Sequence, residues 1–247
     1  LVTTSPDNTR RTERQGEKGR IDYLAVRKKN LYYWTALELI SYAAAALGHV
    51  RRLEAAGERY DLCHAFFTVP AGAVAMLGGG RRPYIVSLRG SDVPGRSGRF
   101  VWFYRLFGFA LRMIWRRARV VAANSEELKE LAEATDAGAG IEVIPNGVDT
   151  VKFHPDTGRR RPFTILTVGR LIAGKDLTTV VRATAIVRER FPQTRLLVVG
   201  DGPQREGLTR TARELGIEGQ VEFRSWVSWE DIDDIYRQAG VFALTSL

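Results

Sequence analysis

Two cations in the stretch VGRLIAGKDL (168–177) have the types and spacing to hold a phosphate. The stretch is close to the phosphate-cradling pattern G-x-x-x-x-G-K-[ST], but Asp176 stands where that pattern needs a hydroxyl for Mg²⁺. We therefore expect a different site, in which Arg170 and Lys175 bind a diphosphate and Gly169 allows close backbone approach. The alternative is an ordinary strand-to-helix turn with two solvated cations.

A second glycine-rich turn lies in LLVVGDGP (196–203), again after an apolar run. The dinucleotide fingerprint G-x-G-x-x-G would need glycine where Arg205 stands, so the spacing argues against that site. The turn formed by Gly200, Asp201, Gly202 and Pro203 can still let the backbone pass close to a base or ribose. The alternative is a tight turn without a ligand.

A third group of polar residues, Arg89, Ser91 and Asp92, follows a candidate strand in SLRGSDVPG (87–95). At the carboxyl end of a parallel strand these residues would face a ligand cleft, although an Arg-Asp pair can also be purely structural. Asn146 precedes a glycine, which indicates a turn first and a ligand contact second.

Other residues are weaker candidates. Cys63 and His64 lie in the apolar run YDLCHAFF, which predicts a core thiol and a core histidine. The predicted helix 99–119 carries six arginines and no acid, and Arg105, Arg112, Arg116 and Arg119 fall near one face. This helix could rest on an anionic membrane surface, or it could be a docked domain helix with a solvated basic face.

Short apolar runs alternate with helical patterns along the chain. Several runs are apolar on both faces, which is typical of buried parallel strands, and the alternation predicts doubly wound parallel sheets. The expected strands are 61–67, 83–88, 119–124, 141–145, 163–169, 195–200, 220–225 and 240–245. The expected helices are 34–57, 70–78, 99–118, 125–135, 175–191, 203–215 and 228–238, and Ser125 is the expected N-cap of the fourth.

The alternation occurs in two series, which predicts two domains. We expect an N-terminal domain over 1–150, a turn-rich linker over 151–162 and a C-terminal domain over 163–247, with a ligand cleft between the strand ends. Residues 6–20 are polar without a period and are expected to form a mobile loop. The chain starts on the strand-like LVTTS and stops on VFALTSL, so we expect a fragment with both domains incomplete.

The overall charge favours an anionic partner. The net charge of +9 is typical of proteins that bind nucleic acid, acidic membrane surfaces or phosphorylated substrates. One cysteine without metal-ligand spacing fits a reducing cytosol, and no membrane-spanning run or signal peptide is evident.

Seven segments in order resemble the GT-B retaining glycosyltransferases of glycosyltransferase family four and its neighbours. They cover most of residues 60–247 and include PYIVSLRGSDVPG, IEVIPNGVDTVKFHP, ILTVGRLIAGKDLTTVVRA and LLVVGDGPQREGL. The resemblance implies two Rossmann-like domains, with acceptor binding on the N-terminal side and nucleotide-sugar binding on the C-terminal side.

The resemblance also implies roles for single residues. Arg170 and Lys175 match the catalytic pair that grips the donor diphosphate and stabilises it as a leaving group. The loop from Gly200 to Pro203 matches the turn near the nucleotide, and Val227 matches a position beside the base. The segment with Arg89 matches one that lines the sugar site, usually with histidine at that position, which puts a histidine-like role in doubt.

The implied reaction is transfer of a sugar from a UDP- or GDP-linked donor to a hydroxyl of a glycan, lipid or small molecule. The resemblance implies retained anomeric configuration, no metal and no other cofactor, in the cytoplasm or at the inner face of the membrane. The family's glycine loop and E-x7-E motif are not found in the chain, so we expect the fragment to be inactive alone. The alternatives are a GT-B nucleotide-sugar epimerase and a non-catalytic basic protein that binds a membrane surface or nucleic acid.

Overall fold

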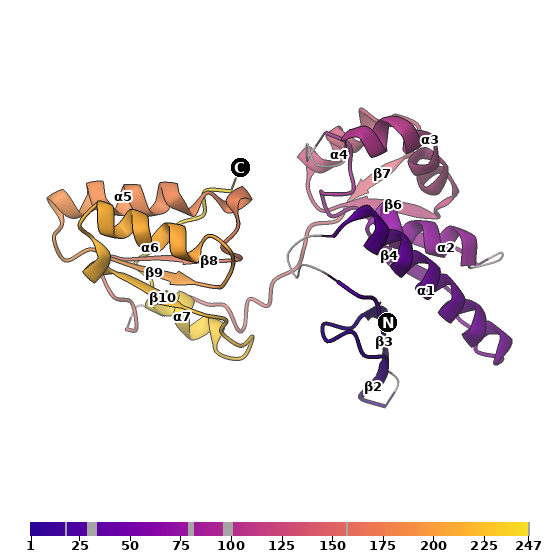
Figure 1. Cartoon of the computed structure of the whole chain (residues 1–247), viewed down its shortest axis with the longest axis horizontal. Helices are drawn as coiled ribbons and strands as arrows, with labels where there is room; N and C mark the ends of the chain where they lie inside the picture. Colours follow the sequence, from indigo (N-terminus) through magenta and orange to yellow (C-terminus); the bar gives the residue numbers. More distant parts are fainter. Residues whose placement is uncertain (18, 29–33, 79–81, 96–100, 157, 247) are drawn as a thin grey trace. The chain divides into compact units, whose positions relative to one another are not determined.

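The computed structural model describes residues 1–17, 19–28, 34–78, 82–95, 101–156 and 158–246, without the side chains of 101–107. The chain divides into two compact units, Leu1–Gly147 (unit 1) and Val148–Leu247 (unit 2), which are the two groups of elements in Figure 1. The predicted linker, 151–162, lies within the second unit.

Unit 1 contains two sheets and four α-helices among its described residues. Its elements are β1 (Val2–Thr4), β2 (Arg11–Gln15), β3 (Gly19–Leu24), α1 (Ala36–Ala55), β4 (Cys63–Phe66), a short π-type turn (Thr68–Gly72), α2 (Ala73–Gly78), β5 (Tyr84–Ser87), α3 (Val101–Arg117), β6 (Val120–Ala123), α4 (Glu126–Glu133) and β7 (Ile141–Val143).

The larger sheet of unit 1 has the order β4-β5-β6-β7, with every neighbouring pair parallel. Its core gathers residues from alternate positions of the strands and from α3 and α4, including Val86, Val121, Trp115 and Leu128. Trp115 is fully buried and comes from the basic helix predicted over 99–119. The described end of that helix is therefore docked on its own domain through an apolar face.

The prediction of a mobile loop over residues 6–20 is wrong. β2 and β3 pair antiparallel, with residues 11–15 opposite 19–23, and β1 pairs parallel with β3 to complete a small sheet, β1-β3-β2. Polar side chains contribute to this sheet: the buried Asp22 accepts from Thr12 across the hairpin at 2.8 Å and from Arg20 of its own strand at 3.0 Å. A cross-strand hydrogen bond between Thr12 and Asp22, and the Arg11 guanidinium 4.4 Å from the centre of the Tyr23 ring, replace the apolar alternation by which a strand is usually found.

Unit 2 is one four-stranded sheet with helices on both faces. Its elements are β8 (Thr164–Val168), a 3₁₀ turn (Ala173–Lys175), α5 (Leu177–Arg190), β9 (Arg195–Val199), α6 (Arg205–Glu214), a second 3₁₀ turn (Glu218–Gln220), β10 (Val221–Arg224), α7 (Ile232–Gln238) and β11 (Val241–Phe242). The order is β10-β9-β8-β11, all parallel.

Two apolar clusters show why the strands of unit 2 are apolar on both faces. Leu196 and Val198 face α5 and α6, where they meet Val181 and Leu208. Leu197 and Val199 face the other side, toward Ile235 of α7. Figure 1 shows α5 and α6 over one face of the sheet and α7 over the other. The predicted doubly wound α/β class is confirmed for this unit.

Candidate functional site

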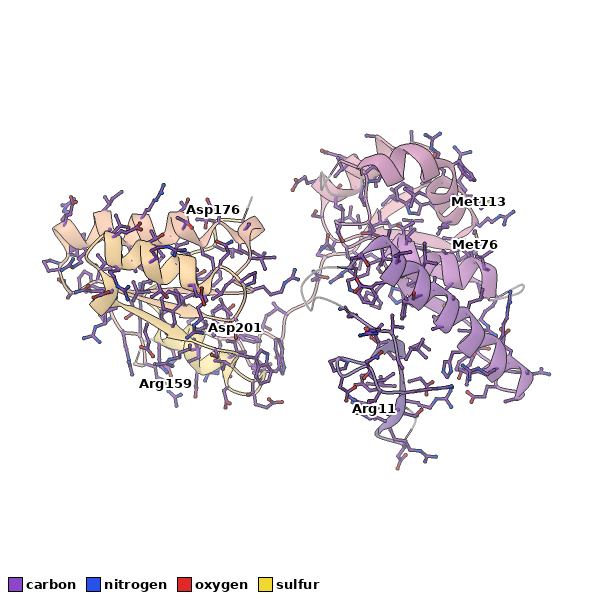
Figure 2. The ribbon with its side chains drawn as sticks, viewed as in Figure 1. Arg11, Met76, Met113, Arg159, Asp176 and Asp201 are labelled. Atoms are coloured by element: carbon purple, nitrogen blue, oxygen red, sulfur yellow. The ribbon has the colours of Figure 1, made fainter. Side chains whose placement is uncertain are left out.

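The loops that follow β8 and β9 meet at one edge of the unit 2 sheet, because parallel strands end on the same side. Backbone bonds continue past the strands: Gly169 N donates to Val199 O at 3.0 Å, and Gly200 N donates to Arg224 O at 2.9 Å. Figure 2 labels Asp176 and Asp201 at this end of the unit. The structure thus brings together the two glycine-rich turns that the sequence singled out.

Glycine is required at two positions of the second turn. Gly200 has φ +137°, and a Cβ there would lie 2.0 Å from the carbonyl oxygen of Gly169. Gly202 has φ +156°, and a Cβ there would lie 2.4 Å from the carbonyl oxygen of Leu171. The two loops therefore touch backbone to backbone, an approach that a side chain at either glycine would block.

Two further bonds join the loops. Leu171 N donates to Asp201 O at 2.9 Å, and Gln204 N donates to Leu171 O at 2.9 Å. Pro203 and the Asp201 side chain are exposed, and Asp201 Oδ1 accepts from Gly202 N at 2.8 Å. The loop cluster is therefore a fixed surface rather than two independent loops.

The two predicted phosphate ligands lie in the loop after β8. Arg170 is exposed, and Lys175 is half-buried at the end of the 3₁₀ turn. The Lys175 amine donates to Ser246 Oγ at 3.1 Å. Asp176 follows in the left-handed region (φ 40°, ψ 45°) and its carboxylate accepts from Thr179 Oγ1 at 2.7 Å, so it serves the start of α5.

Val227 lies in the loop after β10 and is half-buried. It packs against the cluster of Leu166, Leu197, Val199 and Ile235 beneath the sheet. Its neighbour Trp226 is 79% exposed. Val227 thus anchors this loop, and an aromatic ring stands beside it at the surface.

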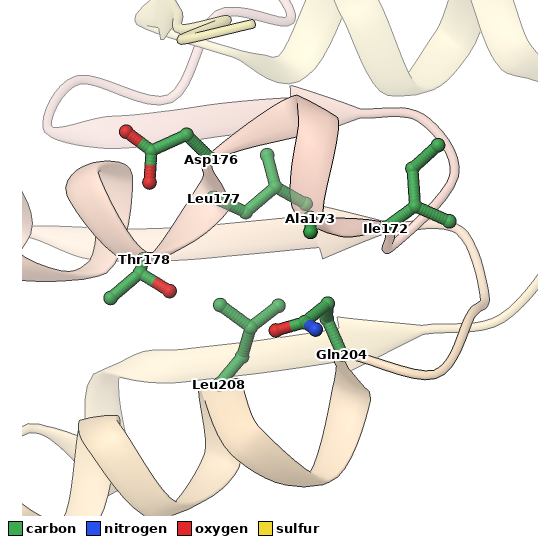
Figure 3. A pocket seen from close by; sticks show the side chains of 7 residues that line it. All are labelled: Ile172, Ala173, Asp176, Leu177, Thr178, Gln204 and Leu208. Carbon is green, nitrogen blue, oxygen red and sulfur yellow. The ribbon is translucent and has the colours of Figure 1, made fainter. Parts of the chain in front are cut away.

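A small hollow lies between the starts of α5 and α6 (Figure 3). It has a volume of about 200 Å³ and is lined by Ile172, Ala173, Asp176, Leu177, Thr178, Gln204 and Leu208. Figure 3 shows Gln204 and Leu208 pointing from α6 toward the start of α5. Arg170 and Lys175 are not among the lining residues, although Ile172, Ala173 and Asp176 of the same loop are.

The predicted residues of unit 1 divide into a buried group and an exposed one. Asp92 is 5% exposed; its carboxylate accepts from Arg89 N at 2.9 Å and from Thr68 N at 2.7 Å. Thr68 Oγ1 in turn accepts from Trp115 Nε1 at 2.8 Å. Asp92 therefore holds the loop after β5 onto the turn after β4, which is a positioning role.

Arg89, Ser91 and Asn146 are exposed at the same loops. The Arg89 guanidinium donates to Asn146 Oδ1 at 3.0 Å and stands 5.7 Å from the centre of the Phe66 ring. The expected contact between Arg89 and Asp92 is thus made by the backbone amide of Arg89. The guanidinium of Arg89 binds the Asn146 side chain instead.

The prediction that His64 is a core histidine is wrong. His64 is exposed, its Nε2 lies 2.7 Å from Ser87 Oγ, and its ring stacks on Phe66 with centroids 4.5 Å apart. In β4, His64 and Phe66 lie on the exposed face, while Ala65 between them points into the core. Cys63 is half-buried against that core, and burial raises the pKa of its thiol.

The described end of α3 keeps a basic outer face. Arg112, Arg116, Arg117 and Arg119 are all exposed, and Arg116 also donates to the Asp136 carboxylate through two bonds of 2.8 Å. That guanidinium lowers the pKa of the Asp136 carboxyl. The side chain of Arg105 lies outside the described residues.

Three contacts at these loops were not predicted: those of Thr68, Thr245 and Ser246. Each is a small hydroxyl residue next to a loop, and only the fold brings Thr245 to the turn at 175–176. Across the residues that the structure describes, no group of three or more His, Cys, Asp or Glu residues could hold a metal ion. No helix in the same residues is long and apolar enough to cross a membrane.

Two protein families match the chain. The family described as Glycosyltransferase Family 4 matches residues 1–152, and the one described as Glycosyl transferases group 1 matches residues 149–247. Both families were the ones that the seven sequence segments resembled, so that resemblance is confirmed.

Among curated relatives, the chain is 34% identical over 147 residues to the GDP-mannose-dependent α-(1-6)-phosphatidylinositol monomannoside mannosyltransferase of Mycolicibacterium smegmatis. That match covers 55% of this chain and 38% of the relative. The mannosylfructose-phosphate synthase of Agrobacterium fabrum is 32% identical over 124 residues, which cover 43% of this chain and 27% of the relative. The chain thus spans well under half the length of these relatives.

Solved structures share the fold at low identity. Sucrose-phosphate synthase from Thermosynechococcus elongatus aligns with a TM-score of 0.76 at 20% identity, over 99% of this chain and 64% of that one. The Anabaena protein HepE, solved with UDP and glucose, aligns with a TM-score of 0.68 at 19% identity, over 92% of this chain and 61% of that one.

Proposed function

Because the chain belongs to glycosyltransferase family 4, we propose that it serves transfer of a sugar from a UDP- or GDP-linked donor to a hydroxyl acceptor, with unit 2 binding the donor. The observation that carries the proposal is the loop cluster of unit 2. There the turn at Gly200–Pro203 touches the loop of Gly169 and Arg170 backbone to backbone. We propose that a diphosphate lies against this glycine-rich backbone surface and pairs with the side chains of Arg170 and Lys175.

The proposed chemistry follows from where charge develops. A nucleotide sugar carries its charge on the diphosphate, and cleavage of the sugar–phosphate bond builds negative charge on the bridging oxygen. Arg170 and Lys175 are proposed to stabilise that charge in the transition state, without a metal. Retention of configuration, with the leaving phosphate accepting the proton of the acceptor hydroxyl, is part of the proposal through the family.

Substrate identity is proposed at the level of class. The name of the first mannosyltransferase relative contains GDP-mannose and a phosphatidylinositol acceptor, so GDP-mannose is the first donor to assay. In unit 1, Arg89, Ser91 and Asn146 are proposed to bind the sugar or the acceptor, with Asp92 holding their loop. We also propose that the basic face of α3 rests on an anionic membrane surface, at the cytoplasmic side.

The donor proposal is tested by calorimetric binding of UDP and GDP to the chain. Arg170→Ala and Lys175→Ala should each weaken binding about 10- to 100-fold, because each removes a charge-assisted bond to phosphate. In a preparation that turns over donor, each change should lower kcat by about 10²–10³, or 3–4 kcal/mol in the barrier. Addition of EDTA should leave both quantities unchanged.

Arg210→Ala is the matched control, since Arg210 is an exposed arginine of the same unit on α6. Its variant should bind like the wild type. Wild-type affinity in both loop variants, with the circular dichroism spectrum intact, would refute the roles of Arg170 and Lys175. Donor consumed without an acceptor and with an epimeric product would favour the epimerase alternative.

A further inference from the structure

Thr245, just beyond the short strand β11, contacts the turn that carries Lys175. We propose that Thr245 is a positioning residue for Lys175: its hydroxyl fixes the backbone turn from which the Lys175 amine reaches the diphosphate. The inference rests on the proposed function for the identity of the ligand. The contacts themselves do not depend on it.

The sheet brings the two segments together. β11 pairs parallel with β8, with Val241 opposite Ile165 and Phe242 opposite Leu166, and Ala243 N donates to Leu166 O at 2.8 Å. The chain after β11 therefore runs to the same sheet edge as the loop after β8. Residues about 70 positions apart in the sequence meet there.

The Thr245 hydroxyl bonds a backbone turn in an unusual conformation. Thr245 Oγ1 donates to Asp176 O at 2.8 Å and lies 3.3 Å from Lys175 O. Asp176 is in the left-handed region, which is uncommon for residues with a Cβ although aspartate adopts it more readily than most. Because a threonine hydroxyl has one proton, the shorter bond is the main one, and it secures the residue directly after Lys175.

The neighbouring residue holds the other end of Lys175. The Lys175 amine donates to Ser246 Oγ at 3.1 Å, so one dipeptide, Thr245-Ser246, contacts both the backbone and the side chain of this lysine. Ser246 is exposed and neutral, which makes it a weak partner that a diphosphate can replace. The arrangement presents the amine at the loop surface instead of leaving its rotamer free.

Thr245→Val tests the proposal, because it removes the hydroxyl and keeps the branched shape, while Thr245→Ser keeps the hydroxyl. Thr245→Val should weaken UDP and GDP binding about 10- to 100-fold and leave uridine and guanosine binding unchanged. Thr245→Ser should restore the diphosphate affinity. In the background of Lys175→Met, Thr245→Val should cause no further loss, since the two residues act as a unit.

The matched control is Thr209→Val. Thr209 Oγ1 donates to Arg205 O at 3.0 Å inside α6, so this variant loses the same kind of bond away from the loop. Equal losses for nucleoside and nucleoside diphosphate in Thr245→Val would mean a merely structural role and overturn the proposal. Additive losses in the double variant would do the same.

A second measurement separates this inference from the donor proposal. If the wild-type chain binds neither UDP nor GDP, the proposed function fails, and amide hydrogen exchange then decides about Thr245. Thr245→Val should speed exchange of the amides of Asp176 and Thr179, which form the bonds of this turn, and Thr209→Val should not. Unchanged exchange at both amides would overturn the proposal.

Discussion

Asp176 shows how one residue type decides which phosphate site a loop can form. In the pattern G-x-x-x-x-G-K-[ST] the next residue would offer a hydroxyl to Mg²⁺. Here Asp176 adopts the left-handed region, and its carboxylate is occupied by Thr179. The sequence argued that Asp176 cannot replace the hydroxyl of that pattern. In the structure its carboxylate accepts a hydrogen bond from Thr179 in the first turn of α5.

At Gly200 the geometry makes a sharp prediction. Gly200→Ala should destabilise the chain by about 2 kcal/mol or more, since the new Cβ would meet the Gly169 carbonyl at 2.0 Å and φ is +137°. It should also weaken UDP or GDP binding by displacing the loop that carries Arg170. Urea denaturation and calorimetry measure the two effects.

Gly174→Ala is the control in the neighbouring loop. A Cβ at Gly174 would meet no atom within 4 Å, and its φ is in the ordinary range. This variant should fold and unfold like the wild type. If Gly200→Ala were equally harmless, the close approach of the two loops would be wrong.

At the scale of elements, the β2–β3 hairpin is held by a polar cluster. The buried Asp22 carboxylate receives bonds from Thr12 and Arg20, and His49 of α1 lies 3.1 Å from it. Burial alone would raise the pKa of Asp22, but the bonds from Thr12 and His49 and the charge of Arg20 outweigh it and lower the pKa. The ionised carboxylate thus joins the hairpin to α1.

Asp22→Asn should therefore lower the free energy of unfolding by about 1–3 kcal/mol at neutral pH. Because the folded-state pKa lies below the ordinary value of about 3.9, the stabilisation is present above that pH. It is lost as the pH falls through the folded pKa. The gap between wild type and variant should close in urea denaturation below about pH 4.

Glu13→Gln provides the comparison on the same hairpin. Glu13 pairs with Arg11 at 2.9 Å, but its side chain is 44% exposed, so its removal should have little effect at any pH. If Asp22→Asn were still less stable than the wild type at low pH, the loss would come from altered packing or hydrogen-bond geometry and not from the missing charge.

At the scale of the whole molecule, the net charge of +9 favours an anionic partner. The described end of α3 carries the exposed Arg112 and Arg117, and Phe109 on the same helix is 68% exposed. Its opposite face enters the core through Ile114 and Trp115. One face of the helix thus packs in its own domain while exposed arginines make another part of its surface basic. The sequence alone offered these two descriptions as alternatives.

The membrane proposal is tested by sedimentation with vesicles that contain phosphatidylserine. Arg112→Ala with Arg117→Ala should weaken binding about 30-fold, from about 1 kcal/mol for each arginine near the surface. Arg182→Ala with Arg210→Ala removes the same charge from exposed positions of unit 2 and should bind like the wild type. Equal weakening in both pairs would show a general charge effect. Salt-sensitive binding of DNA with no binding of vesicles would favour the nucleic-acid alternative.

The sequence by itself determined most of the elements and the choice of candidate loops. Strands such as 163–169 and 195–200 were found because burial on both faces requires apolar residues at every position. Ser125 was recognised as an N-cap because that contact is local, and its Oγ accepts from Leu128 N at 3.2 Å. The glycine-rich turns were found for the same reason, since a positive φ or a close backbone approach requires glycine at a particular position of a short stretch.

Only the tertiary structure decided which of these residues act together. The hairpin at residues 11–24 escaped notice because polar contacts join its strands, such as Thr12 with Asp22 and Arg11 with Tyr23, and these have no apolar period. The contact of Thr245 with the turn after Lys175 joins segments about 70 residues apart, and a hydroxyl residue carries no signal of its distant partner. Long-range hydrogen bonds of this kind are specified by the packing of the whole sheet, so no short stretch of sequence could contain them.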